Sequence, residues 1–388
     1  MHVLFLTPWY PNRRDAMDGI FVRKHAQAVR AQGAQVSVIR VRTDEKTDHM
    51  EVDTSEVEGV LEVMVYTPVV KVPVLKQLSI AFNFVLGFAR AYKVIEQRLG
   101  RPDVTQVNVL TRMGVMAWAL KKTKGIPYVV IEHWGRYLQQ FDRYKGFIRK
   151  RATELVCRNA ECIMPVSESL ACGMRKCGLK AKKWKVVNNV VNDFFFTDER
   201  HDKADGITRF ICNSNPGEDC EKCKNINGII RSFGRVASNG KQVHLTIVGL
   251  DHDSTPSIGN TVDQLGLGDL VTFAGCVTPP DVSRLMHESD ALVLFSYNET
   301  ASCITAEAMA SGTPAIATPV GIVPLVVNEK TGIIVPIADE DALTAAMTSV
   351  ADDKSRFNRD EIIKMGRAYC YPSVGQFLMA VYADVLKK

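Results

Sequence analysis

The sequence predicts an α/β protein built from two doubly wound parallel sheets, one in each half of the chain. The length of 388 residues exceeds what a single hydrophobic core usually supports, so two domains are expected. Short apolar segments alternate with helical patterns long enough to connect parallel strands. This alternation restarts after the polar, Asp-rich stretch 197–206. A hydrophobic content of 46% and a charged content of 23% exclude a mainly disordered chain.

The first half of the chain opens with a short apolar strand, and helices and strands then alternate. Residues 57–67 alternate apolar and polar side chains, which predicts a strand with one face exposed. Gly33 and Gly100 follow helical patterns and are expected to end them. The predicted strands cover residues 3–7, 35–41, 57–67, 104–110, 128–131, 162–166 and 184–187. The predicted helices cover residues 20–31, 75–99, 113–121, 148–158 and 170–177.

The second half repeats the same kind of alternation and ends in a helical segment. Its apolar segments lie at residues 210–213, 226–236, 243–248, 262–265, 271–273, 281–286, 291–295, 303–310, 315–317 and 339–350. The last stretch carries apolar residues at helical spacing and is too short to form a domain. We therefore predict an N-terminal domain over 1–190, a C-terminal domain over 191–370, and a helix over 371–388 that packs back on the first. Open α/β sheets bind ligands at the carboxyl ends of their strands, so a groove between the domains is the expected site.

Charge and cysteine content narrow the function classes. Residues 1–187 hold 31 basic and 17 acidic residues, a net charge of +14, whereas residues 188–388 have a net charge of −9. A basic half suggests an anionic ligand or surface, and uneven solvation of two surfaces is the alternative. The longest apolar stretch, near 79–89, is shorter than a membrane span, and residues 1–9 lack a basic leader. With ten sparse cysteines, a reduced cytoplasmic protein is expected.

Two carboxylates spaced eight residues apart form the most informative pattern. A strand at 291–295 precedes a loop with Glu299, and Glu307 lies on the following helix. Carboxylates accept paired hydrogen bonds from vicinal hydroxyls, which suits a ribose or hexose. Ser302, Cys303 and Ile304 open the helix, whose free N–H groups suit a phosphate. On spacing alone, Glu307 in an ordinary Glu-Ala-Met-Ala helix is the simpler interpretation.

This segment resembles the E-x7-E and E-A-M-A-x-G-x-P block of the retaining GT-B glycosyltransferases of glycosyltransferase family 4. Other segments fit in the same order. They are Thr7-Pro8-Trp9-Tyr10-Pro11 with Gly19-Ile20-Phe21, Glu132-His133-Trp134, residues 185–191, Lys224-Asn225-Ile226 and Val271-Thr272-Phe273-Ala274-Gly275. The resemblance covers nearly the whole chain. It implies two Rossmann-like domains facing across a cleft, with the acceptor on the first and a nucleotide sugar on the second.

The resemblance also implies a role for individual residues. Glu307 would bind the ribose hydroxyls, and Glu299 would stabilise charge at the anomeric centre of the transferred sugar. Lys224 would neutralise the departing diphosphate, a role that a cation can perform without a metal. Gly19 would approach the phosphates, and His133 would lie near the acceptor and donor sugar. A purely structural histidine is the alternative for His133.

The sequence departs from the family pattern at four places, one of which is Asn192, where an Asp is common. No arginine precedes Lys224 in the stretch 214–219, so Lys222 is the candidate replacement. Thr300-Ala301-Ser302-Cys303 stands where the family often has Gly-Phe-Gly. Gly321-Ile322-Val323-Pro324-Leu325 replaces the usual G-G-x-P-E, which would change the sugar pocket. An altered donor or a weakened enzyme would be consistent with these losses.

The mechanism implied by the resemblance is transfer with retention, in which the leaving diphosphate deprotonates the acceptor. No Asp-x-Asp motif is present, and Cys220-Glu-Lys-Cys223 has no second ligand pair, so neither metal nor cofactor is expected. Two alternatives stay open: an isomerase or hydrolase on the same fold, such as a sugar-nucleotide 2-epimerase, and a catalytically silent sugar-nucleotide binding protein. No dinucleotide-binding G-x-G-x-x-G follows a strand, and no nucleic-acid recognition motif accompanies the basic half.

A basic, partly apolar helix near residue 148 suggests where the acceptor lies. Its cations alternate with apolar side chains, and a polybasic surface of this kind is attracted to an anionic leaflet. The residues are Arg143, Tyr144, Lys145, Phe147, Ile148, Arg149, Lys150 and Arg151. One hypothesis is peripheral docking at the inner face of the membrane to reach a lipid-linked glycan, as in cell-surface polysaccharide biosynthesis. An ordinary solvated helix face is the alternative.

Overall fold

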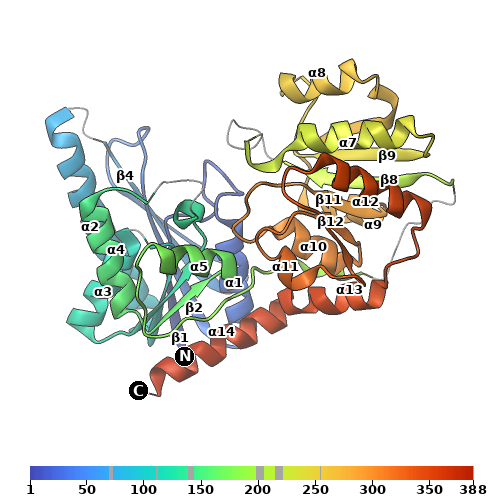
Figure 1. Cartoon of the computed structure of the whole chain (residues 1–388). Helices are drawn as coiled ribbons and strands as arrows, with labels where there is room; N and C mark the ends of the chain where they lie inside the picture. Colours follow the sequence, from blue (N-terminus) through green and yellow to red (C-terminus); the bar gives the residue numbers. More distant parts are fainter. Residues whose placement is uncertain are drawn as a thin grey trace. The chain divides into compact units, whose positions relative to one another are not determined.

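The chain divides into two compact units, each with its own sheet. The computed structural model describes residues 1–69, 73–110, 112–138, 144–197, 205–214, 222–253 and 255–387. Unit 1 comprises Met1–Val190 and Tyr371–Lys388, and unit 2 comprises Val191–Cys370. Figure 1 shows the helices and strands of both units, which are described separately below.

Unit 1 contains a seven-stranded sheet in the order β3-β4-β2-β1-β5-β6-β7. All neighbouring strands pair in parallel except β3, which is antiparallel to β4. The strands are β1 (His2–Leu6), β2 (Gln35–Thr43), β3 (Glu51–Val57), β4 (Val60–Thr67), β5 (Val104–Asn108), β6 (Tyr128–Glu132) and β7 (Cys162–Pro165). Every residue of β1, β5, β6 and β7 is buried, as expected of parallel strands covered by helices on both faces.

The helices of unit 1 connect these strands, and the C-terminal helix joins them. They are α1 (Ile20–Ala31), α2 (Pro73–Leu99), α3 (Arg112–Lys124), η1 (Gly135–Tyr137), α4 (Phe147–Asn159), α5 (Glu168–Lys176) and α14 (Tyr371–Leu386). α14 packs on α1, where a Cβ on Gly375 would collide with the Ala28 carbonyl oxygen. The Tyr382 hydroxyl donates a hydrogen bond to Gln106 of β5. The last helix of the chain is therefore part of the core of unit 1 (Figure 1).

The prediction for residues 57–67 was wrong in two respects. A tight turn at Glu58 and Gly59 separates β4 from an additional edge strand, β3, and β4 is buried along its whole length. The sequence suggested an exposed polar face on this strand because it contains the charged residue Glu62. This carboxylate is nevertheless buried, because the Arg23 guanidinium lies 3.0 Å away and the Tyr10 hydroxyl donates to it at 2.7 Å. The predicted strand at 184–187 is reduced to an isolated bridge between Trp184 and Ile163.

The apolar stretch in α2 is longer than predicted. The Lys76–Leu99 part of α2 is long and apolar enough to cross a membrane by length and composition alone, and 28% of its most apolar window is buried. Its C-terminal half packs on β2 and β4, with Ala91 and Ile95 fully buried. Leu78, Phe82 and Val85 near its N-terminus are 69%, 68% and 51% exposed. The two halves of this helix therefore have different surroundings.

Unit 2 contains a six-stranded parallel sheet in the order β10-β9-β8-β11-β12-β13. The strands are β8 (Thr208–Asn213), β9 (Val243–Val248), β10 (Val271–Gly275), β11 (Ala291–Leu294), β12 (Ala315–Ala317) and β13 (Gly332–Ile334). The helices are η3 (Asp193–Phe196), α7 (Ile226–Ser238), α8 (Pro256–Gln264), η4 (Gly268–Leu270), α9 (Pro279–His287), α10 (Cys303–Ser311), α11 (Val323–Val326), α12 (Glu340–Asp352), α13 (Arg359–Gly366) and η5 (Arg367–Tyr369). α7 packs with α12, and α10 packs with α9 and α13, so helices cover both faces of the sheet (Figure 1).

Both sheets have one point at which the strand order reverses. In unit 1 this point lies between β1 and β5, and in unit 2 between β8 and β11. The loops that leave two such strands diverge to opposite faces, which opens a crevice at their carboxyl ends. The predicted fold class of two doubly wound α/β domains is thus confirmed, with the antiparallel β3 as an addition.

Candidate functional site

Lys224 and Glu299 form an ion pair at the strand-order reversal of unit 2. Lys224 precedes α7 in the connection that follows β8, and Glu299 lies in the loop that follows β11. The Lys224 Nζ is 2.6 Å from the Glu299 Oε1, and the two side chains are only 17% and 12% exposed. The structure therefore brings together two of the three residues predicted to be catalytic. A partly desolvated pair of this kind is held by mutual attraction and hydrogen bonding, and an incoming anion would compete for the lysine.

Main-chain contacts fix the loop that carries Glu299. The Tyr297 N–H donates to the Cys223 carbonyl at 2.7 Å, which links the loop to the residue before Lys224. The Ser296 hydroxyl donates to the Glu299 Oε1 at 3.0 Å. Gly321 adopts a φ of 57°, and a Cβ there would lie 3.1 Å from the Glu299 Cβ. Sequence reasoning missed Ser296, because a serine at the end of a strand carries no motif of its own.

The N-terminus of α10 lies directly after Glu299. Ser302 has a φ of 70°, and its hydroxyl pairs with Thr305 at 2.8 Å. The first N–H groups of a helix have no acceptor within the helix, so this end suits an anion. The Ile304 side chain is buried and the Cys303 side chain is exposed, so Ile304 can reach a ligand only through its main chain. Glu307 lies one turn further along α10 and is partly buried.

Gly19 occupies the start of α1 in unit 1. Its φ is 63°, and a Cβ would lie 2.7 Å from the Tyr10 nitrogen and closer still to the Trp9 carbonyl. The packing of the β1–α1 loop against its own helix therefore explains why this residue is a glycine. The family resemblance attributes the same residue to an approach to phosphates, and the two explanations are compatible because both need bare backbone.

His133 lies after β6, surrounded by rings. Its ring centroid is 4.4 Å from that of Phe21 and 5.7 Å from that of His25. Burial, with the nearby His25 adding to it, holds the pKa of His133 well below its usual range, so the ring is neutral at pH 7. The His25 Nε2–H donates a hydrogen bond to the Asn188 carbonyl at 2.9 Å, and burial lowers the pKa of His25 to about 4.

Glu132 organises the loop that presents His133. The carboxylate is fully buried and accepts main-chain hydrogen bonds from Leu110, His133 and Trp134 at 2.9–3.0 Å. Burial raises its pKa, and the three N–H donors and the nearby Arg136 oppose that shift. The Glu-His-Trp motif is therefore held by its acidic residue, which fixes the turn after β6.

Other predicted residues of unit 2 take no part in the Lys224–Glu299 ion pair. The Lys222 side chain is exposed, and no contact with Glu299 is found. The stretch 215–221, which includes Cys220 and most of the segment lacking the family arginine, lies outside the described residues. Among the residues described, no three His, Cys, Asp or Glu side chains gather closely enough to hold a metal ion. Burial raises the pKa of Cys212 to about 12, so this neighbour of Lys224 stays a thiol.

A cavity at the strand-order reversal of unit 1 was not anticipated. It has a volume of about 750 Å³ and is lined by the ends of β1, β2, β4, β5 and β6 and by α2, α3 and α4. Trp9 and Trp134 lie edge to face in its wall, with ring centroids 5.6 Å apart. The guanidinium of Arg136 lies 4.4 Å from the Trp134 ring. The signal in the sequence is the run Trp134-Gly-Arg136-Tyr137 directly after a buried strand.

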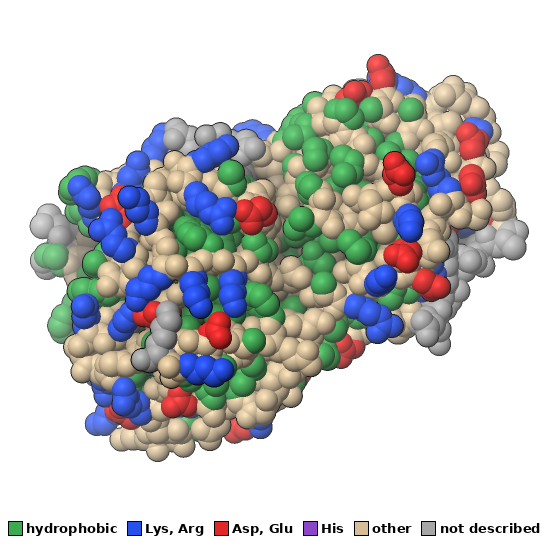
Figure 2. Space-filling view, turned by 60° about the horizontal axis from the view of Figure 1, so that its bottom comes forward, with side chains coloured by type: hydrophobic (Ala, Val, Ile, Leu, Met, Phe, Trp, Pro, Cys, Tyr) green, Lys and Arg blue, Asp and Glu red, His purple; other side chains and the backbone are tan. Residues whose placement is uncertain are grey.

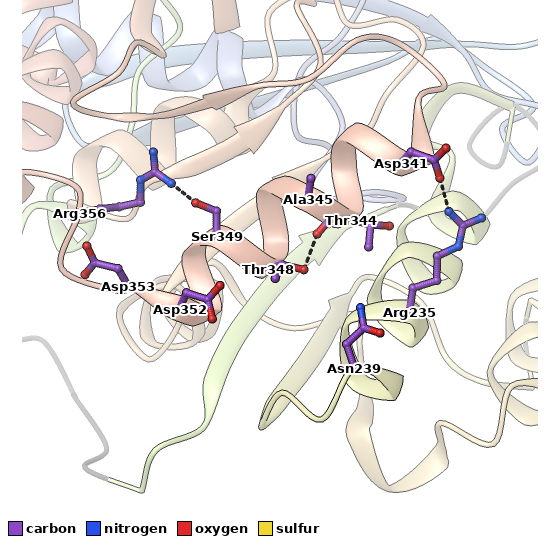
Figure 3. Close-up of a pocket in the computed structure, with 10 residues that line it drawn as sticks. All are labelled: Arg235, Asn239, Asp341, Thr344, Ala345, Thr348, Ser349, Asp352, Asp353 and Arg356. Carbon is purple, nitrogen blue, oxygen red and sulfur yellow. Dashed lines mark hydrogen bonds and ion pairs between the residues drawn. The ribbon is translucent and has the colours of Figure 1, made fainter.

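A second depression, of about 1000 Å³, lies on the outer surface of unit 2 between α7 and α12 (Figure 3). Its polar groups are already satisfied by exposed neighbours. Arg235 pairs with Asp341 at 2.6 Å, the Arg356 guanidinium donates to Ser349, and Thr348 donates to the Thr344 carbonyl. None of its residues lies at the carboxyl end of a strand. This depression is therefore a groove between two helices and not the candidate site.

Comparison with known proteins defines the class to which this fold and site belong. The fold is GT-B: a sucrose-phosphate synthase from Thermosynechococcus elongatus superimposes over the whole of both chains with a TM-score of 0.76 at 19% identity. Anabaena HepE, in complex with UDP and glucose, superimposes with a TM-score of 0.71 at 15% identity, covering 98% of this chain and 99% of HepE.

Sequence profiles then give the family. The profile of glycosyltransferase family 4 matches residues 19–193, and that of the group 1 glycosyl transferases matches residues 216–353. The chain therefore belongs to the group 1, family 4 glycosyltransferases, which confirms the resemblance. A D-inositol 3-phosphate glycosyltransferase from Corynebacterium kroppenstedtii is 30% identical over 133 residues, 32% of this chain. The chain matches 28% of the length of that curated relative.

Proposed function

We propose that the protein transfers a sugar, with retention at the anomeric carbon, from a nucleoside diphosphate sugar to a glycan or lipid-linked acceptor. Unit 2 would hold the donor and unit 1 the acceptor. The observation that carries this proposal is the Lys224–Glu299 ion pair beside the N-terminus of α10. A cation, a carboxylate and a helix N-terminus at one sheet edge match the diphosphate and hydroxyl groups of such a donor.

The proposed steps follow from these side chains. The donor diphosphate displaces Glu299 from Lys224, and the ammonium then stabilises the negative charge that develops on the leaving oxygen. Glu299, freed from the lysine, faces the positive charge that develops at the anomeric carbon. Ser302, Cys303 and Ile304 donate main-chain N–H groups to the phosphates, with Lys222 in place of the missing arginine. Glu307 accepts hydrogen bonds from the ribose hydroxyls.

Unit 1 contributes a neutral histidine and a close backbone approach. His133, uncharged because it is buried, can accept or donate a hydrogen bond without adding a charge to the acceptor site. Gly19 leaves the start of α1 bare. Retention needs no protein base in this scheme, because a diphosphate oxygen takes the acceptor proton as the glycosidic bond to the acceptor oxygen forms on the same face. No metal is needed in the scheme, since Lys224 supplies the positive charge.

We also propose a cytoplasmic location with peripheral contact at the inner membrane face, in the synthesis of a cell-surface polysaccharide. Figure 2 supports this by showing many Lys and Arg side chains, with fewer acidic ones, on the visible face of unit 1. Phe147 and Ile148 of α4 are 75% and 83% exposed beside the exposed Arg149. Tyr144, predicted to share this face, is instead buried against Tyr137, and Arg143 lies outside the described residues.

A ligand screen and a product analysis test the proposed function. Sugar derivatives of uridine, guanosine and adenosine diphosphate are compared by thermal shift, since a ligand at about 100 times its Kd stabilises the folded state by about 2.7 kcal/mol. Transfer products are then examined by NMR for the anomeric configuration. A retained configuration supports the proposal. An inverted product, free sugar without acceptor, or an epimerised donor would each overturn it.

A matched pair of variants tests the role of Glu299. Glu299→Gln keeps the size of the side chain and removes the charge, so turnover should fall by about 10²-fold or more while donor affinity persists. Glu361→Gln makes the same change at the exposed start of α13 and should leave turnover unchanged. Full turnover in Glu299→Gln would overturn the role assigned to Glu299. Donor binding without any turnover in the unaltered protein would instead favour a silent binding protein.

A further inference from the structure

The cavity of unit 1 combines cations with apolar walls. Four arginines line it, Arg42, Arg112, Arg136 and Arg149, and no Asp or Glu is among the lining residues that the structure describes. The remaining wall is mainly aromatic and aliphatic, with Trp9, Trp134, Phe84, Met113, Val115, Ile148 and Val156. A ligand that fits must therefore present an anionic group and an apolar group to the same cavity.

Arg136 is the buried cation of this cavity. The residue is only 3% exposed, its Nη2 donates to the Leu110 carbonyl and the Tyr137 hydroxyl, and its Nε has no hydrogen-bond partner among the described residues. The nearest buried carboxylate, Glu132, already accepts three main-chain hydrogen bonds. A buried guanidinium with an unused donor favours an anion that is absent from the free protein.

The position of the cavity adds to its preference for an anion. It lies at the strand-order reversal between β1 and β5, where Arg112 and Met113 form the first turn of the 13-residue helix α3. Free N–H groups and the helix dipole favour negative charge at such an end. Arg112 stands there over the Phe84 ring, 5.4 Å from its centroid, and no carboxylate within the described chain pairs with it.

Two helices that line the cavity, α2 and α4, also have large apolar side chains exposed to solvent. Phe84 of α2 and Ile148 of α4 line the cavity. On the same helices, Leu78, Phe82 and Phe147 are between 68% and 75% exposed. Large apolar side chains exposed on helices that also line a ligand site are consistent with contact with lipid.

We propose that this cavity binds the phosphate group of a lipid-linked acceptor. Arg112 and Arg136 bind the phosphate, the lipid chain lies against Phe84 and Ile148, and the exposed residues of α2 and α4 enter the membrane from which the lipid comes. The inference rests on the proposed function in that it assigns the acceptor of the same reaction. It goes further in naming the acceptor chemistry and the residues that select it.

Binding to the whole protein, without any sugar nucleotide, tests the proposal. The probe is dodecyl phosphate, and binding is followed by the fluorescence of Trp9 and Trp134 in the cavity wall. Methyl phosphate offers the anion alone and dodecyl maltoside the chain alone. Dodecyl phosphate should bind at least about tenfold more tightly than either, because charge-assisted hydrogen bonds and apolar burial then add. Equal binding of methyl phosphate would identify a soluble phosphate ligand and overturn the lipid assignment.

Variants distinguish binding in the cavity from nonspecific attraction of the anion to the basic surface of unit 1. Arg112→Gln and Phe84→Ala should each weaken dodecyl phosphate binding about tenfold. Lys122→Gln removes the same charge from the other end of α3, about 15 Å along the helix, and should leave binding unchanged. An equal loss in Lys122→Gln would overturn the proposal. Because the assay lacks a donor, tight binding in a protein without transferase activity refutes only the proposed function, and weak binding in an active enzyme refutes only this inference.

A membrane arm tests the exposed residues. The protein is sedimented with phosphatidylcholine vesicles that contain or lack phosphatidic acid. Phe82→Ser with Phe147→Ser should reduce sedimentation with the phosphatidic acid vesicles about tenfold or more, since both rings leave the lipid. The same double variant should keep its affinity for dodecyl phosphate in solution. Unchanged sedimentation would overturn the membrane part of the proposal.

Discussion

The two strand-order reversals have the same topology and opposite electrostatic designs. In unit 2, Lys224 and Glu299 face each other at 2.6 Å, so the free protein holds a neutral pair. In unit 1, no ion pair of Arg112 or Arg136 is found in the described chain; aromatic rings lie beside both, and the nearby Glu132 carboxylate is taken up by three main-chain hydrogen bonds. The difference shows that two sheets with the same doubly wound topology can form two kinds of site at their strand-order reversals. A paired cation must be released by its ligand, whereas an unpaired one attracts its ligand directly.

Ligand binding should also have different consequences at the two sites. A diphosphate that breaks the pair in unit 2 leaves Glu299 free beside the sugar, so donor binding itself would prepare the carboxylate. An anion in the cavity of unit 1 breaks nothing and only gains contacts. Substitutions should therefore affect the two sites differently: turnover should respond in unit 2 and affinity in unit 1.

The largest effect is expected at the cation of unit 2. Lys224→Ala should lower kcat about 10²- to 10³-fold, because the charge on the leaving diphosphate loses its nearest stabilising group. Lys222→Ala should have a smaller effect, since its side chain is exposed. Steady-state kinetics with the donor found by thermal shift measure both. Lys330→Ala, an exposed lysine elsewhere in unit 2, is the control and should behave as the unaltered protein. A larger loss in Lys222→Ala than in Lys224→Ala would reverse the assigned roles.

The fold and the two residues of the ion pair in unit 2 were identified from the sequence, whereas the cavity of unit 1 was not. Both sheets were predicted from the alternation of short apolar segments with helical patterns, because buried parallel strands appear in the sequence as short apolar runs between helices. Glu299 and Lys224 each belong to a motif that the sequence analysis singled out, but their ion pair was not predicted, because it joins segments 75 residues apart. Arg112 begins α3 and Arg136 lies in η1, and both line one cavity only because of the way the chain turns after β5 and β6. The burial of Glu62 likewise required a partner, Arg23, from a helix distant in sequence.

Acid should destabilise unit 1 through its buried histidines. The pKa of His25 is about 4 in the folded protein and about 6.5 when unfolded, so between these values the unfolded chain binds the extra proton. Stability therefore falls as the pH drops from about 6.5 to about 4, by up to about 3 kcal/mol for this group. Urea unfolding across this range measures the slope. His25→Gln should flatten it, and an unchanged slope would show that His25 is not the titrating group.

A smaller effect is expected from backbone packing in unit 1. Gly19 and Gly33 both have positive φ, but only Gly19 lacks room for a Cβ. Gly19→Ala should therefore cost about 2 kcal/mol more unfolding free energy than Gly33→Ala, where only the dihedral strain of about 1 kcal/mol applies. Denaturant melts of the two variants provide the comparison. Equal losses would mean that the β1–α1 loop yields, and the turn that bears Trp9 would then be less rigid than its contacts indicate.

The smallest effect on stability and activity is expected from a substitution in the groove between α7 and α12. This groove therefore serves as a control for both sites. Ala345 is exposed and lines this groove, so Ala345→Lys fills part of it without breaking a hydrogen bond. The variant should change the unfolding free energy by less than about 0.5 kcal/mol and leave kcat/KM unchanged. Volume alone does not make a site: the groove is the larger hollow, yet its arginines are already paired at the surface. A marked loss of kcat/KM in Ala345→Lys would show that ligand chemistry extends away from the strand ends, contrary to the argument from the two reversals.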